Sequence, residues 1–123
     1  MRLIRPALLA AGLLLSLPAL AGDRPDHFKG KPAETLKEAV SNFAEYNRKL
    51  DKLLKQKSLA AKDLHDIHVL TYTLENALEK IRADLGALAE TLEAVHVASE
   101  NADAETVRQQ GRAYLDTARE VIR

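Results

Sequence analysis

Cysteine is missing from the 123-residue sequence, and methionine occurs once, as Met1. Without cysteine the chain cannot form disulfides, thiolate metal sites, iron–sulfur clusters or covalent haem links, and it has no cysteine nucleophile. Met1 is expected to leave with a signal peptide, so the mature chain cannot offer a Met/His pair to haem. Bis-histidine ligation stays formally open, but the composition predicts a protein without a cofactor.

Sequence motifs of catalysis are missing too. The chain has no glycine-rich phosphate loop, no nucleophile elbow and no His-Glu-x-x-His zinc motif. Neighbouring acids such as Glu90 and Glu93 have the spacing of ordinary solvated positions on a helix. We therefore expect no enzyme.

A surplus of basic residues is also missing. Lysine and arginine total 18, as do aspartate and glutamate. Removing a signal peptide that carries Arg2 and Arg5 leaves 16 basic against 18 acidic residues, a net charge of −2. Binding to nucleic-acid phosphates requires the opposite balance, so we expect no nucleic-acid partner.

Residues 1–21 have the three parts of a cleavable signal peptide. Arg2 and Arg5 form a positive start, residues 7–17 form an apolar run, and small residues precede a cleavage point after Ala21. The apolar run is about half of the roughly 20 residues that a membrane-spanning helix needs. We therefore expect export to the periplasm of a Gram-negative cell, with secretion as the alternative, and no stable membrane anchor after cleavage.

Residues 22–32 hold two prolines, two glycines and alternating charges, which predict an extended arm. Pro32 suits the first turn of a helix that follows. From there to residue 123 apolar residues recur at steps of three and four, the spacing of helices that pack at shallow angles. The sequence predicts an all-α antiparallel bundle, with helices near 33–57, 61–99 and 104–123. Asn101 is expected to end the second helix and Asp103 to cap the third.

These steps define a predicted apolar seam on each helix. Asn47 and Thr71 are polar seam residues, which usually fix register or partner choice. The seam residues are Leu36, Val40, Phe43, Asn47, Leu50 and Leu54; then Leu64, Ile67, Thr71, Leu74, Leu78, Ile81, Leu85, Leu88, Leu92 and Val95; then Val107, Gly111, Tyr114, Ala118 and Val121.

The central helix is predicted to be longer than either neighbour, so neither neighbour alone can cover its seam. It could break near residues 84–86 to give a four-helix monomer, or a single chain could tolerate thinly covered ends. A second copy could instead pair along the seam. Gly86 costs only about 1 kcal/mol in a helix, so we favour an unbroken helix and a homodimer that completes a four-helix-type bundle. Another periplasmic protein is the alternative partner.

Charge is unevenly distributed along the chain. Residues 48–62 carry a net charge of +5 and residues 75–105 a net charge of −6. Such segments often form a solvated surface. They would also allow the basic end of one chain to meet the acidic end of another in an antiparallel register.

Histidine is the residue that suggests a site. His65 and His68 lie one helical turn apart, and oxygen ligands from Tyr72, Glu75 and Glu79 follow. Such a pair can bind a divalent metal, although it supplies half of a zinc site. A small periplasmic metal-binding protein is therefore the alternative function. A third histidine ligand would come from His27 on the arm or from His96 of another chain.

Three segments give the chain a resemblance to known proteins. They are residues 24–32 leading into Ala33-Glu34-Thr35-Leu36, residues 70–78 (Leu-Thr-Tyr-Thr-Leu-Glu-Asn-Ala-Leu), and residues 111–115 (Gly-Arg-Ala-Tyr-Leu). On these the mature chain resembles a family of small exported proteins of Gram-negative bacteria, a domain of unknown function. It is more loosely similar to the soluble periplasmic cytochrome b four-helix bundles. Their haem ligands have no counterpart here, because no methionine survives cleavage and the last helix has no histidine.

Overall fold

The computed structural model describes residues 29–122. The predicted signal peptide, arm residues 22–28 with His27, and Arg123 lie outside the described residues. Three helices follow one another: α1 (Leu36–Leu54), α2 (Ala61–Glu100) and α3 (Ala104–Val121). No strand occurs within residues 29–122, so the predicted all-α bundle is confirmed. None of the helices in this range combines the length and the apolar content needed to cross a membrane.

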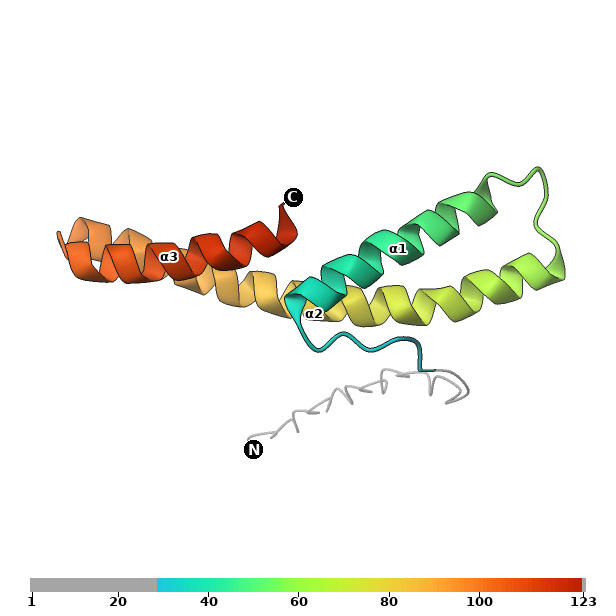
Figure 1. Ribbon diagram of the computed structural model, residues 1–123, viewed down its shortest axis with the longest axis horizontal. Coiled ribbons are helices and arrows are strands. Elements are labelled where there is room, and N and C mark those ends of the chain that lie inside the picture. Colours follow the sequence, from blue (N-terminus) through green and yellow to red (C-terminus); the bar gives the residue numbers. More distant parts are fainter. Residues whose placement is uncertain (1–28, 123) are drawn as a thin grey trace, which may run out of the picture.

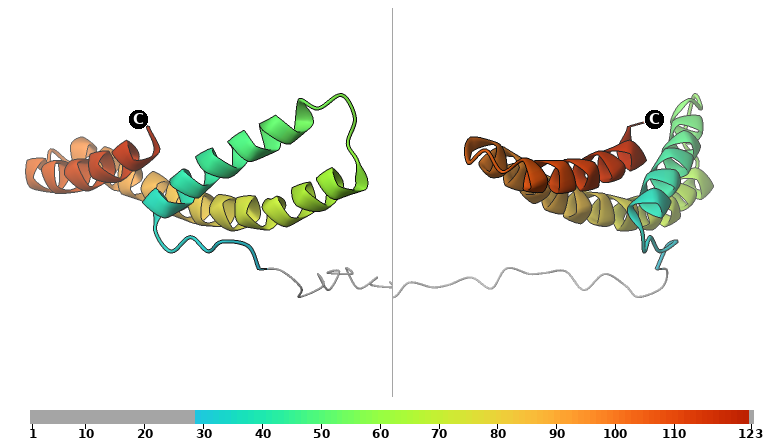
Figure 2. Two further views of the ribbon diagram at one scale, coloured as in Figure 1. Left: turned by 45° about the vertical axis from the view of Figure 1, so that its right-hand side comes forward. Right: turned by 60° about the vertical axis from the view of Figure 1, so that its left-hand side comes forward.

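The two shorter helices lie one after the other along α2 (Figure 1). α1 packs on the first half of α2 and α3 on the second half, and both run antiparallel to it (Figures 1 and 2). α2 continues through Gly86 without a break. Forty residues at about 1.5 Å each make α2 roughly 60 Å long, so it is the axis of the molecule.

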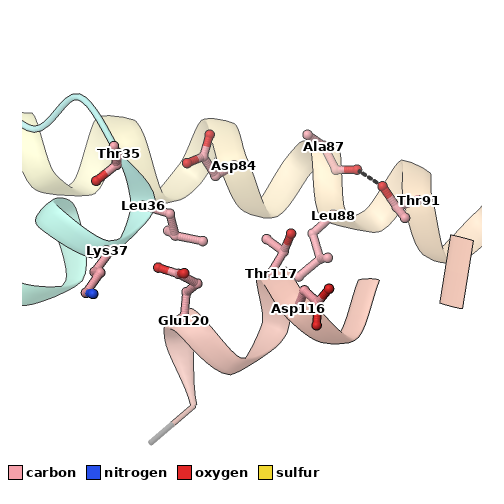
Figure 3. Close-up of a pocket in the computed structure, with 10 residues that line it drawn as sticks. All are labelled: Thr35, Leu36, Lys37, Asp84, Ala87, Leu88, Thr91, Asp116, Thr117 and Glu120. Atoms are coloured by element: carbon pink, nitrogen blue, oxygen red, sulfur yellow. Dashed lines mark hydrogen bonds between the residues drawn. The ribbon is translucent and has the colours of Figure 1, made fainter. Parts of the chain in front are cut away.

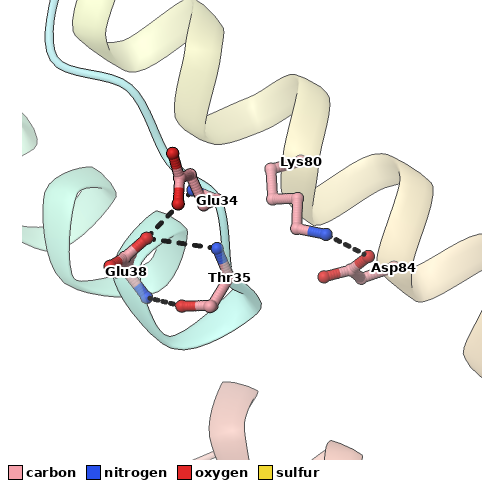
Figure 4. A network of polar contacts seen from close by, with 5 residues as sticks. All are labelled: Glu34, Thr35, Glu38, Lys80 and Asp84. Atoms are coloured by element: carbon pink, nitrogen blue, oxygen red, sulfur yellow. Dashed lines mark hydrogen bonds and ion pairs between the residues drawn. The ribbon is translucent and has the colours of Figure 1, made fainter.

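A capping box fixes the start of α1. The Thr35 hydroxyl accepts the Glu38 N–H at 3.2 Å, and the Glu38 carboxylate accepts the N–H groups of Glu34 and Thr35 at 2.9 and 3.2 Å (Figure 4). The predicted start at residue 33 is therefore wrong, and Pro32 lies before the helix rather than in its first turn. The helix also ends earlier than predicted, at Leu54.

The turn between α2 and α3 closes both helices. Asn101 is the C-cap of α2, and Asp103 caps α3 by accepting the Thr106 N–H at 3.1 Å, as predicted. Ala102 adopts a left-handed conformation with φ 54°, and the Asp103 N–H donates to the Ala98 carbonyl at 2.9 Å. This is a Schellman motif with alanine where glycine is usual.

The buried face of the bundle is turned relative to the predicted seam. Ala39, Ala77 and Ala98 are buried although none is a seam residue. Their small side chains let the helix backbones approach closely there. The seam residues Leu36 and Leu74 are buried with them, so the buried face follows the predicted seam only in part. Several predicted seam residues are consequently exposed: Leu54, Leu64, Leu78, Leu85 and Leu92.

Candidate functional site

A row of exposed leucines runs along the middle of α2. Leu78, Leu85 and Leu92 are 49%, 41% and 46% exposed, and they recur every seven residues. A seven-residue repeat on a continuous helix places them along one side, close to a straight line. We call these three residues the leucine stripe.

The stripe is exposed because α1 and α3 pack on another side of α2. Leu74 and Ala77, which precede Leu78 by four residues and one residue, are buried beneath α1. The two short helices therefore cover the side of α2 that carries Ala77 and Ala98. The three leucines of the stripe are left about half exposed. Exposed apolar patches on soluble proteins often mark contact sites, and the regular spacing of these three leucines along one side of α2 suggests such a site.

The two ends of the molecule carry opposite charge. Residues 48–66, at the end where α1 turns into α2, contain six basic and three acidic residues. We call this segment the basic end. Residues 90–105, where α2 turns into α3, contain five acids and no lysine or arginine, and we call them the acidic end. α2 separates the two by most of its length (Figure 1).

Residues 29–32 run alongside α2 and are bound to it through their backbone (Figure 1). The Lys31 N–H donates to the Thr73 hydroxyl at 2.9 Å, and the Asn76 side-chain amide donates to the Lys29 and Lys31 carbonyls at 2.9 and 3.1 Å. The side-chain amide of Asn42 on α1 donates to the Pro32 carbonyl at 3.1 Å. We call residues 29–32 the strap, because they bind both α1 and α2.

At Gly30 the strap lies so close to α2 that a side chain has no room. Gly30 has φ +68°, and a Cβ atom there would lie 2.7 Å from the Thr73 nitrogen and from the Tyr72 carbonyl carbon. Only glycine fits this left-handed, crowded position. The buried polar residues beneath it, Asn42 and Thr73, both bind the strap, and no buried side-chain N or O within residues 29–122 lacks a partner.

A groove of about 600 Å³ opens where the start of α1 meets the end of α3 over the middle of α2 (Figure 3). Leu36 and Leu88 point into it, and three carboxylates lie at its edge. Two of those carboxylates already face a basic residue of their own helix, since Asp84 pairs with Lys80 at 3.0 Å (Figure 4) and Asp116 pairs with Arg119 at 3.2 Å. The lining residues are Thr35, Leu36, Lys37, Asp84, Ala87, Leu88, Thr91, Asp116, Thr117 and Glu120.

The predicted metal ligands His65 and His68 both lie exposed on the first half of α2. The Tyr72 hydroxyl lies 3.3 Å from His68 Nε2, and the two rings stack edge to face. In the described part of the chain, no three His, Asp or Glu residues gather as a metal would require. His96 lies far along α2 beside Glu100, at 3.4 Å. Metal binding by the His65–His68 pair stays a prediction.

The sequence model of a protein family matches the chain over residues 1–123. The chain belongs to DUF6746, a family of unknown function. No curated protein and no solved structure matches it. In this DUF6746 chain the strap and residues 70–78, two of the segments that suggested a family, are in contact through Thr73 and Asn76. The exported origin and the likeness to cytochrome b bundles stay predictions.

Sequence reasoning missed the strap and its partners. Asn42 and Thr73 lie off the predicted seam, and their role is to bind an extended backbone that has no periodic pattern. The available signal was Gly30 between two lysines and just before Pro32, a composition that favours an ordered turn as much as a free arm.

Proposed function

We propose that this protein is an exported, non-enzymatic helical module that acts through protein–protein contact, with a second copy of itself as the partner. The observation that carries the proposal is the leucine stripe. Three half-exposed leucines at heptad spacing on an unbroken helix occupy one of the two apolar positions that repeat along a coiled-coil strand. A second α2 offers the same pattern, so the stripe is complementary to itself.

Pairing through the stripe would complete a four-helix-type core. Each copy presents one apolar side of α2 that its own α1 and α3 leave open, and burying a leucine fully is worth about 1.5–3 kcal/mol relative to full exposure. Because the three leucines are already half-covered, six of them in a pair supply a moderate driving force. A dimer with micromolar affinity is the expected result.

The test is the mass in solution of the protein expressed from the full sequence, measured by light scattering from 1 to 100 µM. We expect the mass of two chains at the upper concentrations. Leu85→Lys, at 41% exposure, should give the mass of one chain. Leu115→Lys is the matched control, because Leu115 is 48% exposed on α3 and outside the stripe. A single-chain mass for the unchanged protein at 100 µM would overturn the proposal.

Export is the second part of the proposal, and it rests on the signal-peptide features of residues 1–21. Intact mass spectrometry of the protein recovered from a periplasmic extract tests it. We expect a chain that begins at Gly22. Recovery of the uncleaved chain from the cytoplasm alone would contradict export without affecting the dimer.

A further inference from the structure

We infer that the two copies pair antiparallel, so that the basic end of each molecule lies against the acidic end of the other. This inference rests on the proposed function, since it names the orientation of the pair that the leucine stripe forms. It adds a second, polar contact surface at each end of the pair.

Charge decides between the two orientations. A parallel pair would bring two basic ends together, with six basic and three acidic residues each, and two acidic ends with five acids each. Like charges held side by side repel, whereas an antiparallel pair opposes unlike charges at both ends. Lys55 and Lys62 pair with Asp51 and Asp66 of the same chain, but their side chains are 72% and 81% exposed, so a neighbouring chain can reach them.

The end of α2 is itself short of positive charge. The last turn of a helix presents a partial negative charge, which basic residues normally offset. The last turn of α2 has no basic residue, and it carries Glu100, whose side chain is 63% exposed. Asp103 and Glu105 follow at once, and the first arginine of α3 is Arg108. Lysines from a second copy would supply what this end lacks.

The stripe and the charged ends are compatible in one register. When Leu78 of one copy lies opposite Leu85 of the other, Leu92 lies opposite Thr71, and the two α2 helices overlap over almost their whole length. Lys62 then comes opposite Asn101 of the second copy, in the turn that joins Glu100 to Asp103. The apolar contact in the middle and the ionic contacts at the two ends therefore form together.

Distances between spin labels test the orientation. Because the sequence has no cysteine, one introduced cysteine is the only site of labelling in each copy. Ser58→Cys labels the basic end, and Gly86→Cys labels the middle of α2. In an antiparallel pair the Ser58 labels lie roughly 60 Å or more apart, the length of α2, while the Gly86 labels lie within about 30 Å. Ser58 labels within about 30 Å would overturn the antiparallel pair but keep the dimer. Loss of the Gly86 distance would overturn the proposed function itself.

Charge reversal gives an independent test that does not depend on labels. Glu100→Lys/Glu105→Lys changes the net charge of the acidic end from −5 to −1, and Lys57→Glu/Lys62→Glu changes that of the basic end from +3 to −1. We expect each variant alone to dimerise at least tenfold more weakly than the unchanged protein. An equimolar mixture should dimerise more tightly than either variant, because one end of the mixed pair keeps the native contact of +3 against −5. Circular dichroism checks that both variants stay helical. Unchanged affinity of both variants, or a mixture no tighter than either alone, would contradict the antiparallel contact.

Discussion

Gly30 is the residue at which the strap tolerates least change. Gly30→Ala would place a Cβ atom 2.7 Å from the backbone of α2, in a left-handed conformation that alanine avoids. Since the helix backbone cannot move aside, we expect a loss of about 2 kcal/mol in the free energy of unfolding, measured by urea denaturation. Gly111→Ala is the control, because nothing lies within 4 Å of the added atom in α3. Equal stability of the two variants would contradict the close approach of the strap.

Glu38 makes the start of α1 sensitive to acid. The backbone N–H groups of Glu34 and Thr35 donate to its carboxylate and hold its pKa below the ordinary glutamate value. A lowered pKa in the folded state means that this stabilisation is complete above the ordinary value and is lost as the pH falls through the lowered one. We expect Glu38→Gln to flatten part of the acid limb of a stability–pH curve, measured by thermal unfolding.

Other groups leave some acid sensitivity in that variant. The Lys49 ammonium lowers the pKa of Glu45, and hydrogen bonds from Thr106 lower the pKa of Asp103. The two therefore lose stabilisation in the same direction as Glu38 does. A Glu38→Gln curve that coincides with that of the unchanged protein would show that the capping box contributes nothing to the acid limb.

No contact requires glycine at position 86, in the interior of α2. Nothing lies within 4 Å of a Cβ atom added at Gly86, and the helix passes through it unbroken. Alanine is favoured over glycine inside a helix by about 1 kcal/mol, so Gly86→Ala should raise the free energy of unfolding by about that amount. Gly86→Pro, which removes a hydrogen bond and clashes with the preceding turn, should cost about 3 kcal/mol or more. A lower free energy of unfolding for Gly86→Ala would indicate that α2 bends at Gly86.

The helices show how much of the fold can be predicted from the sequence. Steps of three and four predict the helices and their order, because burying one side of each helix imposes that period. They did not predict that Ala77 and Ala98 are buried while the leucine stripe is exposed, since that depends on how closely two helix backbones can approach. Ala102 was missed for a local reason: Asn101 has the residue type that ends helices, while the left-handed residue is the alanine after it.

Self-association at the scale of the whole molecule should appear in thermal unfolding. If folding and pairing are coupled, the melting temperature rises with protein concentration, by a few degrees for each tenfold increase. Leu85→Lys should abolish this dependence and Leu115→Lys should keep it. Differential scanning calorimetry over a hundredfold range of concentration measures both. A melting temperature independent of concentration in the unchanged protein would mean that the monomer folds without a partner.

The strap also sets an order of events in folding. Its hydrogen bonds to α2 join residues 42 to 47 apart in the chain, and its contact with Asn42 requires α1 in place. The two helix hairpins close over neighbouring segments and need no such long loop, so they form first. We therefore expect the strap to close after the rate-limiting barrier. Gly30→Ala should therefore speed unfolding by the whole of its effect on stability and leave the refolding rate unchanged.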